Sequence, residues 1–231
     1  DGHYKGDLIG SGTVIWHARN LLASGEIDYE GFMEMTTSAS PSVGHCNTMG
    51  TALSMNALAE ALGMSLPTCA SIPAPYRERG QMAYTTGKRI CQMVIDGLKP
   101  SKIMTKKSFE NAIAVASALG ASSNCPPLLI VIARHVGIEI TLNDWQRVVE
   151  NVPLIVNCMP AGKYLGEGFH RAGGVPAVMY ELQKAGVLHE DCASVSGKTM
   201  GEIAQQSQTS NADVIFSYEN PLKHGAGFIV M

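Results

Sequence analysis

Residues 44–66 read Gly-His-Cys-Asn-Thr-Met-Gly-Thr-Ala-Leu-Ser-Met-Asn-Ala-Leu-Ala-Glu-Ala-Leu-Gly-Met-Ser-Leu, a small-residue loop followed by the start of a core helix. From Asn47 onward the apolar side chains recur with a helical period, and Gly63 supplies the stop. Cys46 is therefore predicted at a helix start, where the helix dipole and free backbone N–H groups favour a thiolate. A nucleophile or an iron ligand must be a thiolate. On the residues alone, a reactive cysteine and a structural loop cysteine both remain open.

The rest of the chain alternates helical periods with short turns of small and polar residues. Helices are predicted over residues 10–23, 28–36, 77–97, 105–119, 128–136, 142–150 and 169–185. Apolar runs predict strands over residues 152–158, 213–216 and 227–231, and residues 101–105 are expected to be extended. The predicted fold class is therefore α/β, with helix in excess.

Composition narrows the class of protein. The 231 residues are 45% hydrophobic and 16% charged, which is enough apolar material for a core, and the net charge is −3. The sequence has no basic stripe of the kind that binds nucleic acid, and its longest apolar runs are too short to span a membrane. The six cysteines show no CxxC spacing, so most are expected to be reduced and buried. With no signal peptide in the sequence, the expected location is the cytoplasm.

A second candidate segment is Lys163-Tyr-Leu-Gly-Glu-Gly-Phe-His-Arg-Ala-Gly-Gly174. A helix start so rich in glycine is suited to bind an anion through backbone N–H groups, with Arg171 assisting. The alternative is a glycine-rich helix junction with His170 hydrogen-bonded in the core. His45 is a candidate substrate or supporting contact because it adjoins Cys46.

A third segment contains Arg77 and Arg79, at the start of the helix predicted over residues 77–97. Two such cations can bind a carboxylate or a neighbouring subunit. A solvated, ion-paired helix face is the alternative, because exposed pairs are common and contribute little.

Taken in order along the chain, these motifs resemble the dihydroxy-acid and sugar-acid dehydratase family. The resemblance rests on residues 44–52, 55–66, 109–112 (Phe-Glu-Asn-Ala), 120–124 (Gly-Ala-Ser-Ser-Asn) and 169–174. Where the family has Gly-Gly-Ser-Thr-Asn-Ala, this chain has Gly120-Ala-Ser-Ser-Asn-Cys125, followed by two prolines. The combination extends over essentially the whole chain, whereas any single motif would be weak.

The resemblance implies a fold, a reaction and a set of cofactors. Residues 1–215 would form part of an N-terminal α/β domain, and residues 216–231 would begin the connection to a C-terminal β-barrel domain. Members of the family dehydrate a 2,3-dihydroxy acid to a 2-keto-3-deoxy acid, with an iron–sulfur cluster as Lewis acid and a magnesium ion. A 2Fe–2S cluster is favoured over a 4Fe–4S cluster, and a homodimer or homotetramer is expected.

The resemblance assigns one metal ligand to this chain. Cys46 matches the last of three cluster cysteines, and the other two, with most magnesium ligands, would precede Asp1. The general base is expected beyond Met231. The chain is accordingly expected to be an internal segment of a longer polypeptide and inactive on its own.

The resemblance also implies a substrate class. Residues 45–51 and 72–82 resemble the branch that acts on pentonates and hexonates, including arabinonate and xylonate. Branched-chain dihydroxy-acid dehydratase and 6-phosphogluconate dehydratase are the alternatives within the family. Outside it, the alternatives are a thiol enzyme with Cys46 as nucleophile and His45 or His170 as base, or a non-catalytic scaffold.

Overall fold

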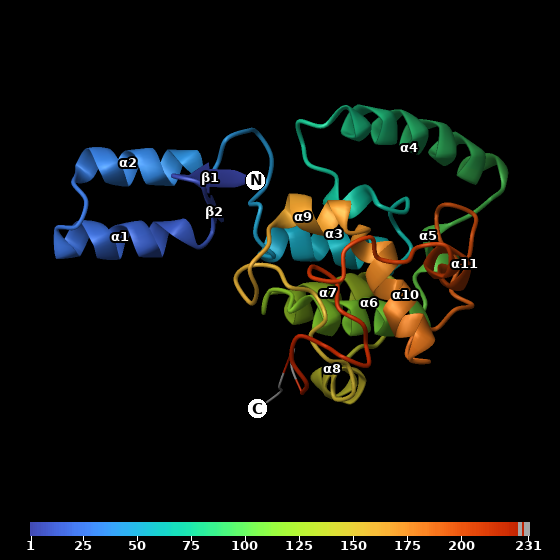
Figure 1. Ribbon diagram of the computed structural model, residues 1–231. Helices are drawn as coiled ribbons and strands as arrows, with labels where there is room; N and C mark the ends of the chain where they lie inside the picture. Colours follow the sequence, from blue (N-terminus) through green and yellow to red (C-terminus); the bar gives the residue numbers. More distant parts are fainter. Residues whose placement is uncertain (226–227, 229–231) are drawn as a thin grey trace.

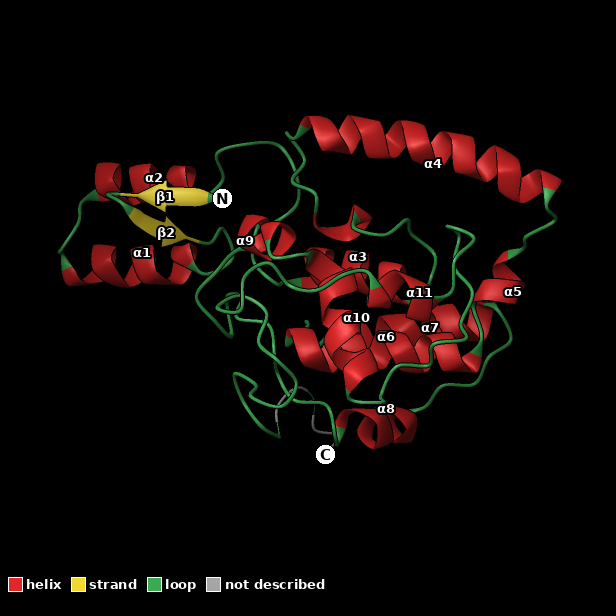
Figure 2. Ribbon diagram, turned by 45° about the vertical axis from the view of Figure 1, so that its right-hand side comes forward, coloured by secondary structure: helices red, strands yellow, loops and turns green. Residues whose placement is uncertain are grey.

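The computed structural model describes residues 1–225 and residue 228, and these residues are predominantly helical (Figure 2). The α-helices are α1 (Val14–Ser24), α2 (Tyr29–Ser38), α3 (Thr51–Ala61), α4 (Arg77–Ile95), α5 (Pro100–Ile103), α6 (Lys106–Leu119), α7 (Cys125–His135), α8 (Leu142–Val149), α9 (Gly166–Arg171), α10 (Gly174–Lys184) and α11 (Met200–Gln205). A short 3-10 helix, η1 (Cys69–Ser71), interrupts the loop between α3 and α4. None of the described helices is both long and apolar enough to cross a membrane.

A small N-terminal lobe stands beside the main body (Figure 1). It consists of α1, α2 and an antiparallel hairpin of β1 (Gly2–Tyr4) and β2 (Asp7–Ile9), which the sequence did not predict. The predicted helices at residues 10–23 and 28–36 are confirmed as α1 and α2. The lobe has an apolar cluster of its own, formed by Val14, Ala18, Met35 and Ala39.

The main body is built around α3, α6 and α10, which contact one another. Helix α6 is buried along most of its length, and Phe109 on it is fully buried. Burying such a side chain contributes about 1.5–3 kcal/mol to folding. Helix α8 begins as predicted, because Thr141 and Asp144 form a capping box. Helix α4 follows the prediction closely but lies along the surface of the body (Figure 1), with most of its side chains exposed.

The helix excess is confirmed, but the strands expected for an α/β fold are not. Residues 152–158 are buried and extended, yet Leu154, Val156 and Cys158 form only isolated bridges. The N–H groups of Ile155 and Val156 both donate to the carbonyl oxygen of Ala118, at the end of α6. The end of a helix therefore occupies one side of this segment, where a sheet would need a second strand.

Three further predictions differ from the structure. Residues 213–216 form one bridge, between Ile215 and Val156, and the strand expected at 227–231 lies almost wholly outside the described residues. Residues 101–105 were expected to be extended but mostly belong to α5, which starts at Pro100 as N-terminal prolines favour. The single helix predicted over residues 169–185 is two helices, because Gly173 (φ 116°), the N-cap of α10, and Gly174 (φ 60°), its first residue, adopt left-handed backbone.

Candidate active site

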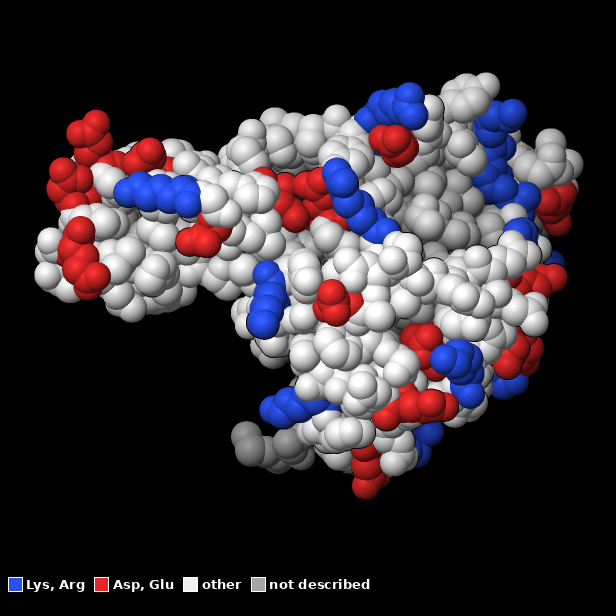
Figure 3. Space-filling model, viewed as in Figure 1, with Lys and Arg blue, Asp and Glu red and all other residues white. Residues whose placement is uncertain are grey.

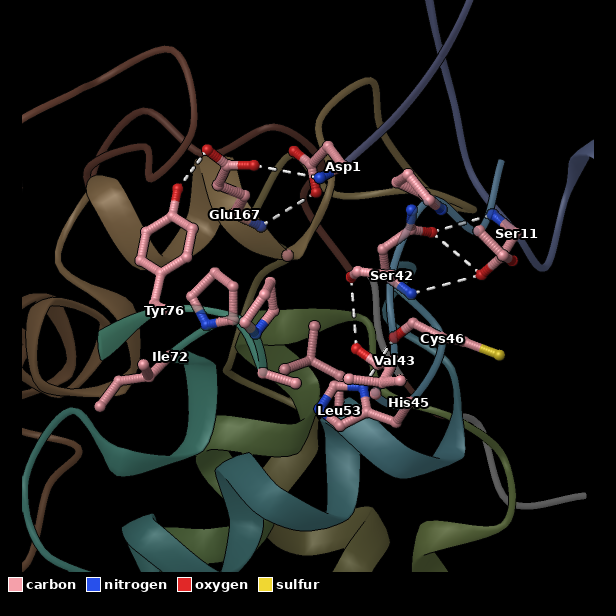
Figure 4. A pocket seen from close by; sticks show the side chains of 18 of the residues that line it. Asp1, Ser11, Ser42, Val43, His45, Cys46, Leu53, Ile72, Tyr76 and Glu167 are labelled. Atoms are coloured by element: carbon pink, nitrogen blue, oxygen red, sulfur yellow. Dashed lines mark hydrogen bonds and ion pairs between the residues drawn. The ribbon is translucent and has the colours of Figure 1, made fainter. Parts of the chain in front are cut away.

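A cavity of about 560 Å³ opens between the main body and the loop that leads from α2 to α3. One wall is the loop of residues 39–47, and the facing wall is the segment of residues 71–76 (Figure 4). Gly166 and Glu167, at the start of α9, and Leu53 and Asn56, on α3, also line the cavity. The remaining lining residues are Asp1, Ser11 and Arg79. Three parts of the sequence that had been singled out separately therefore meet at one cavity.

Cys46 lies in the first wall and is exposed. Helix α3 begins only at Thr51, with Gly50 as its N-cap, so the prediction that Cys46 sits at a helix start is wrong. The intervening residues are held in a loop by contacts with distant parts of the chain. The Asn47 Oδ1 atom accepts hydrogen bonds from the backbone N–H (2.9 Å) and the hydroxyl (3.0 Å) of Ser11, and the Met49 N–H donates to the Met159 carbonyl oxygen (2.8 Å).

His45 also lines the cavity and is exposed. Its Nδ1 atom lies 2.7 Å from the carbonyl oxygen of Cys46. Figure 4 shows the Cys46 sulfur pointing away from the His45 ring. The imidazole is therefore placed to support the backbone of the cysteine, and this geometry does not pair it with the thiol as a base.

His170, on α9, lies behind the facing wall and is half-buried. Its Nδ1 atom is 3.2 Å from the Ser71 hydroxyl oxygen, and its ring meets the Tyr76 ring edge-on with centroids 6.3 Å apart. Burial lowers the pKa of His170 against the opposing effect of Glu78, so the neutral imidazole is favoured. His170 thus contacts the cavity through Ser71, which lines it.

The first two N–H groups of α9 already have acceptors within the protein. The Gly166 N–H donates to the Asn47 carbonyl oxygen (2.7 Å), and the Glu167 N–H donates to the Asp1 carboxylate (3.2 Å). Arg171 is exposed and donates to Glu167 (2.7 Å) and to the Tyr76 hydroxyl (3.0 Å). The interpretation as a glycine-rich helix junction is therefore better supported than anion binding.

Glu167 is one of two acidic residues that line the cavity, the other being Asp1. The Tyr76 hydroxyl donates to its carboxylate at 2.5 Å. This hydrogen bond is the largest of the causes that lower the pKa of Glu167, and the nearby Arg171 guanidinium acts in the same direction. The carboxylate is therefore ionised at neutral pH and fixes the orientation of the tyrosine.

The two arginines of the third segment have different roles. Arg77 is exposed and pairs with Glu78 at 3.3 Å, as expected for a solvated helix face. Arg79 instead donates to two backbone carbonyl oxygens, those of Cys69 (3.0 Å) and Ile72. This second role of Arg79 could not be predicted from the sequence, because the accepting carbonyls belong to an irregular loop.

Two family landmarks are in contact at the start of α3. The Thr51 hydroxyl lies 2.9 Å from the Ser122 hydroxyl and accepts a hydrogen bond from the Asn124 side-chain amide, also at 2.9 Å. The Ser122 N–H donates to the Ser54 hydroxyl at 3.0 Å. The turn at residues 120–124 is therefore hydrogen-bonded to α3, the helix that follows the Cys46 loop.

The cysteines differ sharply in their fitness to bind a metal. Burial raises the pKa of Cys125 and Cys192 to about 11 and that of Cys158 to about 12, so these three remain thiols. Cys69 is half-buried, and burial raises its pKa as well. Within the described residues, no three His, Cys, Asp or Glu side chains are grouped to hold a metal ion. By donor type and exposure Cys46 fits one ligand of an iron–sulfur cluster, and the described chain brings no second cysteine to it.

A buried carboxylate that the sequence analysis overlooked lies beneath the facing wall. Glu60, near the end of α3, accepts hydrogen bonds from the backbone N–H groups of Thr68 (2.6 Å) and Ala70 (2.8 Å). Burial raises the pKa of Glu60 to about 7, although both hydrogen bonds oppose the change. The sequence feature that could have indicated Glu60 is its position among the apolar residues of a predicted core helix.

Glu60 should make the stability of the protein depend on pH near neutrality. Its pKa is 4.5 in the reference state and about 7 in the folded state, so between these values only the folded state keeps the proton. The free energy of unfolding therefore falls as the pH rises from 4.5 to 7, by on the order of 3 kcal/mol. We expect Glu60→Gln to remove this contribution, which urea unfolding of both proteins at about pH 5 and about pH 8 would measure.

The comparison between the two proteins isolates Glu60 from other groups. The lowered pKa of His170 acts in the opposite direction, because its contribution is lost as the pH falls below the unfolded value. Since His170 is present in both proteins, its effect cancels in the difference. Parallel pH curves for wild type and Glu60→Gln would contradict the prediction.

Comparison with known proteins gives one consistent result. Residues 3–203 match the family described as dihydroxy-acid/6-phosphogluconate dehydratase N-terminal. The whole chain is 58% identical to D-xylonate dehydratase of Caulobacter vibrioides and 46% identical to L-arabinonate dehydratase of Rhizobium leguminosarum bv. trifolii. It is 39% identical over 219 residues, 95% of the chain, to dihydroxy-acid dehydratase of Caldanaerobacter subterraneus subsp. tengcongensis. The matched regions span 39%, 40% and 39% of these three relatives, respectively.

Proposed function

The chain belongs to the dihydroxy-acid/6-phosphogluconate dehydratase family, and from this premise we propose that it is part of a hydro-lyase that dehydrates a pentonate sugar acid. The product would be the corresponding 2-keto-3-deoxy acid. The observation that carries the substrate class is the order of similarity, in which xylonate and arabinonate dehydratases (58% and 46%) precede a dihydroxy-acid dehydratase (39%). The expectation from residues 45–51 and 72–82 points to the same branch.

The cavity is suited to such a substrate in size and lining. Its volume of about 560 Å³ falls within the range of roughly 300–1,000 Å³ typical of small-molecule sites. Its walls combine apolar groups, among them Leu53 and Ile72, with the polar side chains of His45, Asn56 and Tyr76. Such a lining can orient a polyhydroxy acid through a few hydrogen bonds while excluding much of the water.

In this proposal Cys46 is one ligand of an iron–sulfur cluster at the rim of the cavity. When bound, a cluster with one open iron supplies a Lewis acid for the leaving hydroxyl group. The chain itself presents the Cys46 thiol, supports its backbone through His45 and shapes the cavity beside it. The remaining cluster cysteines, the magnesium ligands and the general base would come from other parts of the protein.

The thiol-enzyme alternative has less support in the geometry. The His45 ring bonds the Cys46 carbonyl oxygen, and His170 lies behind Ser71 on the facing wall. Neither imidazole is therefore placed as the partner base that a thiol nucleophile requires.

The proposal predicts which acids the full-length protein dehydrates. After anaerobic reconstitution with iron, sulfide and magnesium, we expect 2-keto acid formation from D-xylonate or L-arabinonate. The panel would also contain D-gluconate, 6-phosphogluconate and 2,3-dihydroxyisovalerate. Turnover of only the last two would move the protein to another branch of the family, and no turnover with a well-formed cluster would contradict the proposed substrate class.

A further inference from the structure

The wall of the cavity that faces Cys46 is made of irregular chain. Residues 68–76 contain no regular structure beyond η1, yet Ser71, Ile72 and Tyr76 from this segment line the cavity. In Figure 4, Ile72 and Tyr76 lie across the cavity from His45 and Cys46. A loop of this kind has no hydrogen-bond ladder of its own, so side chains must satisfy its buried backbone groups.

A carboxyl side chain and a guanidinium side chain do this from opposite sides. The Glu60 carboxylate accepts from the N–H groups of Thr68 (2.6 Å) and Ala70 (2.8 Å). The Arg79 guanidinium donates to the carbonyl oxygens of Cys69 (3.0 Å) and Ile72. Along residues 68–72, the N–H groups therefore bind the Glu60 side chain from α3, and the carbonyl oxygens bind the Arg79 side chain from α4. We call this arrangement the backbone clamp.

The clamp holds a conformation that the loop would not adopt unaided. Thr68 has φ 69°, in the left-handed region that β-branched residues avoid. Such strain costs about 1–3 kcal/mol and persists only where the surroundings impose it. Burying the Glu60 carboxylate adds a desolvation cost, and burial is the main reason that its pKa is raised. The positive φ of Thr68 and the burial of Glu60 both lower the stability of the fold.

The clamped segment is connected to the polar groups around the cavity. Ser71, directly after Ala70, places its hydroxyl 3.2 Å from the His170 imidazole. Tyr76, at the other end of the segment, donates to Glu167 at 2.5 Å. A shift of residues 68–72 would therefore move Ser71 and Ile72 in the cavity wall and disturb the contact with His170.

We infer that Glu60 and Arg79 are positioning residues for the sugar-acid site, which fix the wall of residues 68–76 in its substrate-binding arrangement. The inference rests on the proposed function, since it assigns the cavity to the substrate. Loss of the clamp leaves the wall correctly placed for only a fraction of the time. The apparent substrate affinity falls by that fraction, while saturating substrate selects the correct arrangement and restores turnover.

The test uses Glu60→Gln and Arg79→Lys in the reconstituted full-length protein. Each has a matched control of the same chemistry away from the cavity. Glu181→Gln alters another buried carboxylate that accepts a backbone N–H, that of Tyr218. Arg89→Lys alters another arginine of α4 that donates to a backbone carbonyl, that of Val195. The readouts are amide hydrogen exchange and steady-state kinetics normalised to iron content.

We expect both clamp variants to raise KM by about tenfold or more and to leave the iron-normalised kcat within about threefold of wild type. Amide exchange should accelerate at residues 68–76 and not at α6. Both controls should keep the wild-type KM even where they lower the melting temperature. Arg79 also lines the cavity, so a raised KM in Arg79→Lys supports the inference only together with faster exchange at residues 68–76. If Glu60→Gln does not fold, that pair of readouts in Arg79→Lys decides the question, since Arg79 is only half-buried.

The inference would be overturned by faster exchange of the wall with an unchanged KM, or by unchanged exchange in both clamp variants. A fall in kcat alone, with KM constant, would also reject a positioning role. If wild type turns over no acid of the panel, the proposed function fails instead. The exchange data would then still show whether the clamp holds the wall.

Discussion

Replacing Cys46 with serine should abolish dehydration of sugar acids by the full-length protein and lower its iron content. Cys46 is an exposed thiol at the rim of the cavity, and the described residues bring no other cysteine to it. A serine hydroxyl is of similar size but is a hard, poorly ionised ligand, whereas iron–sulfur clusters are held by thiolates. Because the side chain is exposed, the substitution should leave the fold intact.

The measurement pairs activity with iron analysis and uses Cys91→Ser as its control. Cys91 is also exposed but lies on α4, away from the cavity lining. The control should keep wild-type iron and turnover. A Cys46→Ser protein that retains iron but loses activity would favour the thiol-nucleophile alternative, and unchanged turnover would remove Cys46 from the site altogether.

Phe169→Ala should cause the largest loss of stability among the substitutions considered. Phe169 is fully buried on α9, within the main core cluster. Removing a buried phenylalanine typically costs 3–5 kcal/mol, through lost burial and the cavity that remains, so we expect about that loss here. Since α9 also carries Glu167 and His170, the cavity wall should loosen along with the core.

Urea unfolding measures this loss, and Tyr84→Ala is the control. Tyr84 is an aromatic residue on α4 with 71% of its surface exposed, so its removal should change stability by less than about 0.5 kcal/mol. A loss below about 1 kcal/mol for Phe169→Ala would mean that α9 packs less tightly on the body than the structure shows.

The mixed surface charge of the protein bears on how such variants should behave. In Figure 3, lysine and arginine side chains lie among aspartate and glutamate side chains over the main body, whereas the end of the N-terminal lobe shows mainly acidic side chains. Exposed pairs of this kind, such as Arg77 with Glu78, contribute little to stability. Differences among the variants should therefore be dominated by buried groups, with Glu60 and Phe169 foremost.

The sequence by itself determined the elements whose signals are local. The apolar period gives α4 and α6 almost to the residue, and the Thr141 and Asp144 pair gives the start of α8. Family membership also followed from short motifs read in order, with residues 44–52 foremost, and the match over residues 3–203 confirms it. Such signals depend on neighbours within about one helical turn, which the sequence displays directly.

Only the tertiary structure decided the features that depend on distant residues. Asn47 is held in the loop by Ser11, which moves the start of α3 away from Cys46. Residues 152–158 were expected to form a buried strand, but they do not pair in a sheet. The N–H groups of Ile155 and Val156 instead donate to the Ala118 carbonyl oxygen at the end of α6. Glu60 binds the backbone N–H groups of Thr68 and Ala70, in an irregular loop whose path the helical period does not predict. In each case the backbone partner comes from packing rather than from the local sequence, and local periodicity carries no information about that partner.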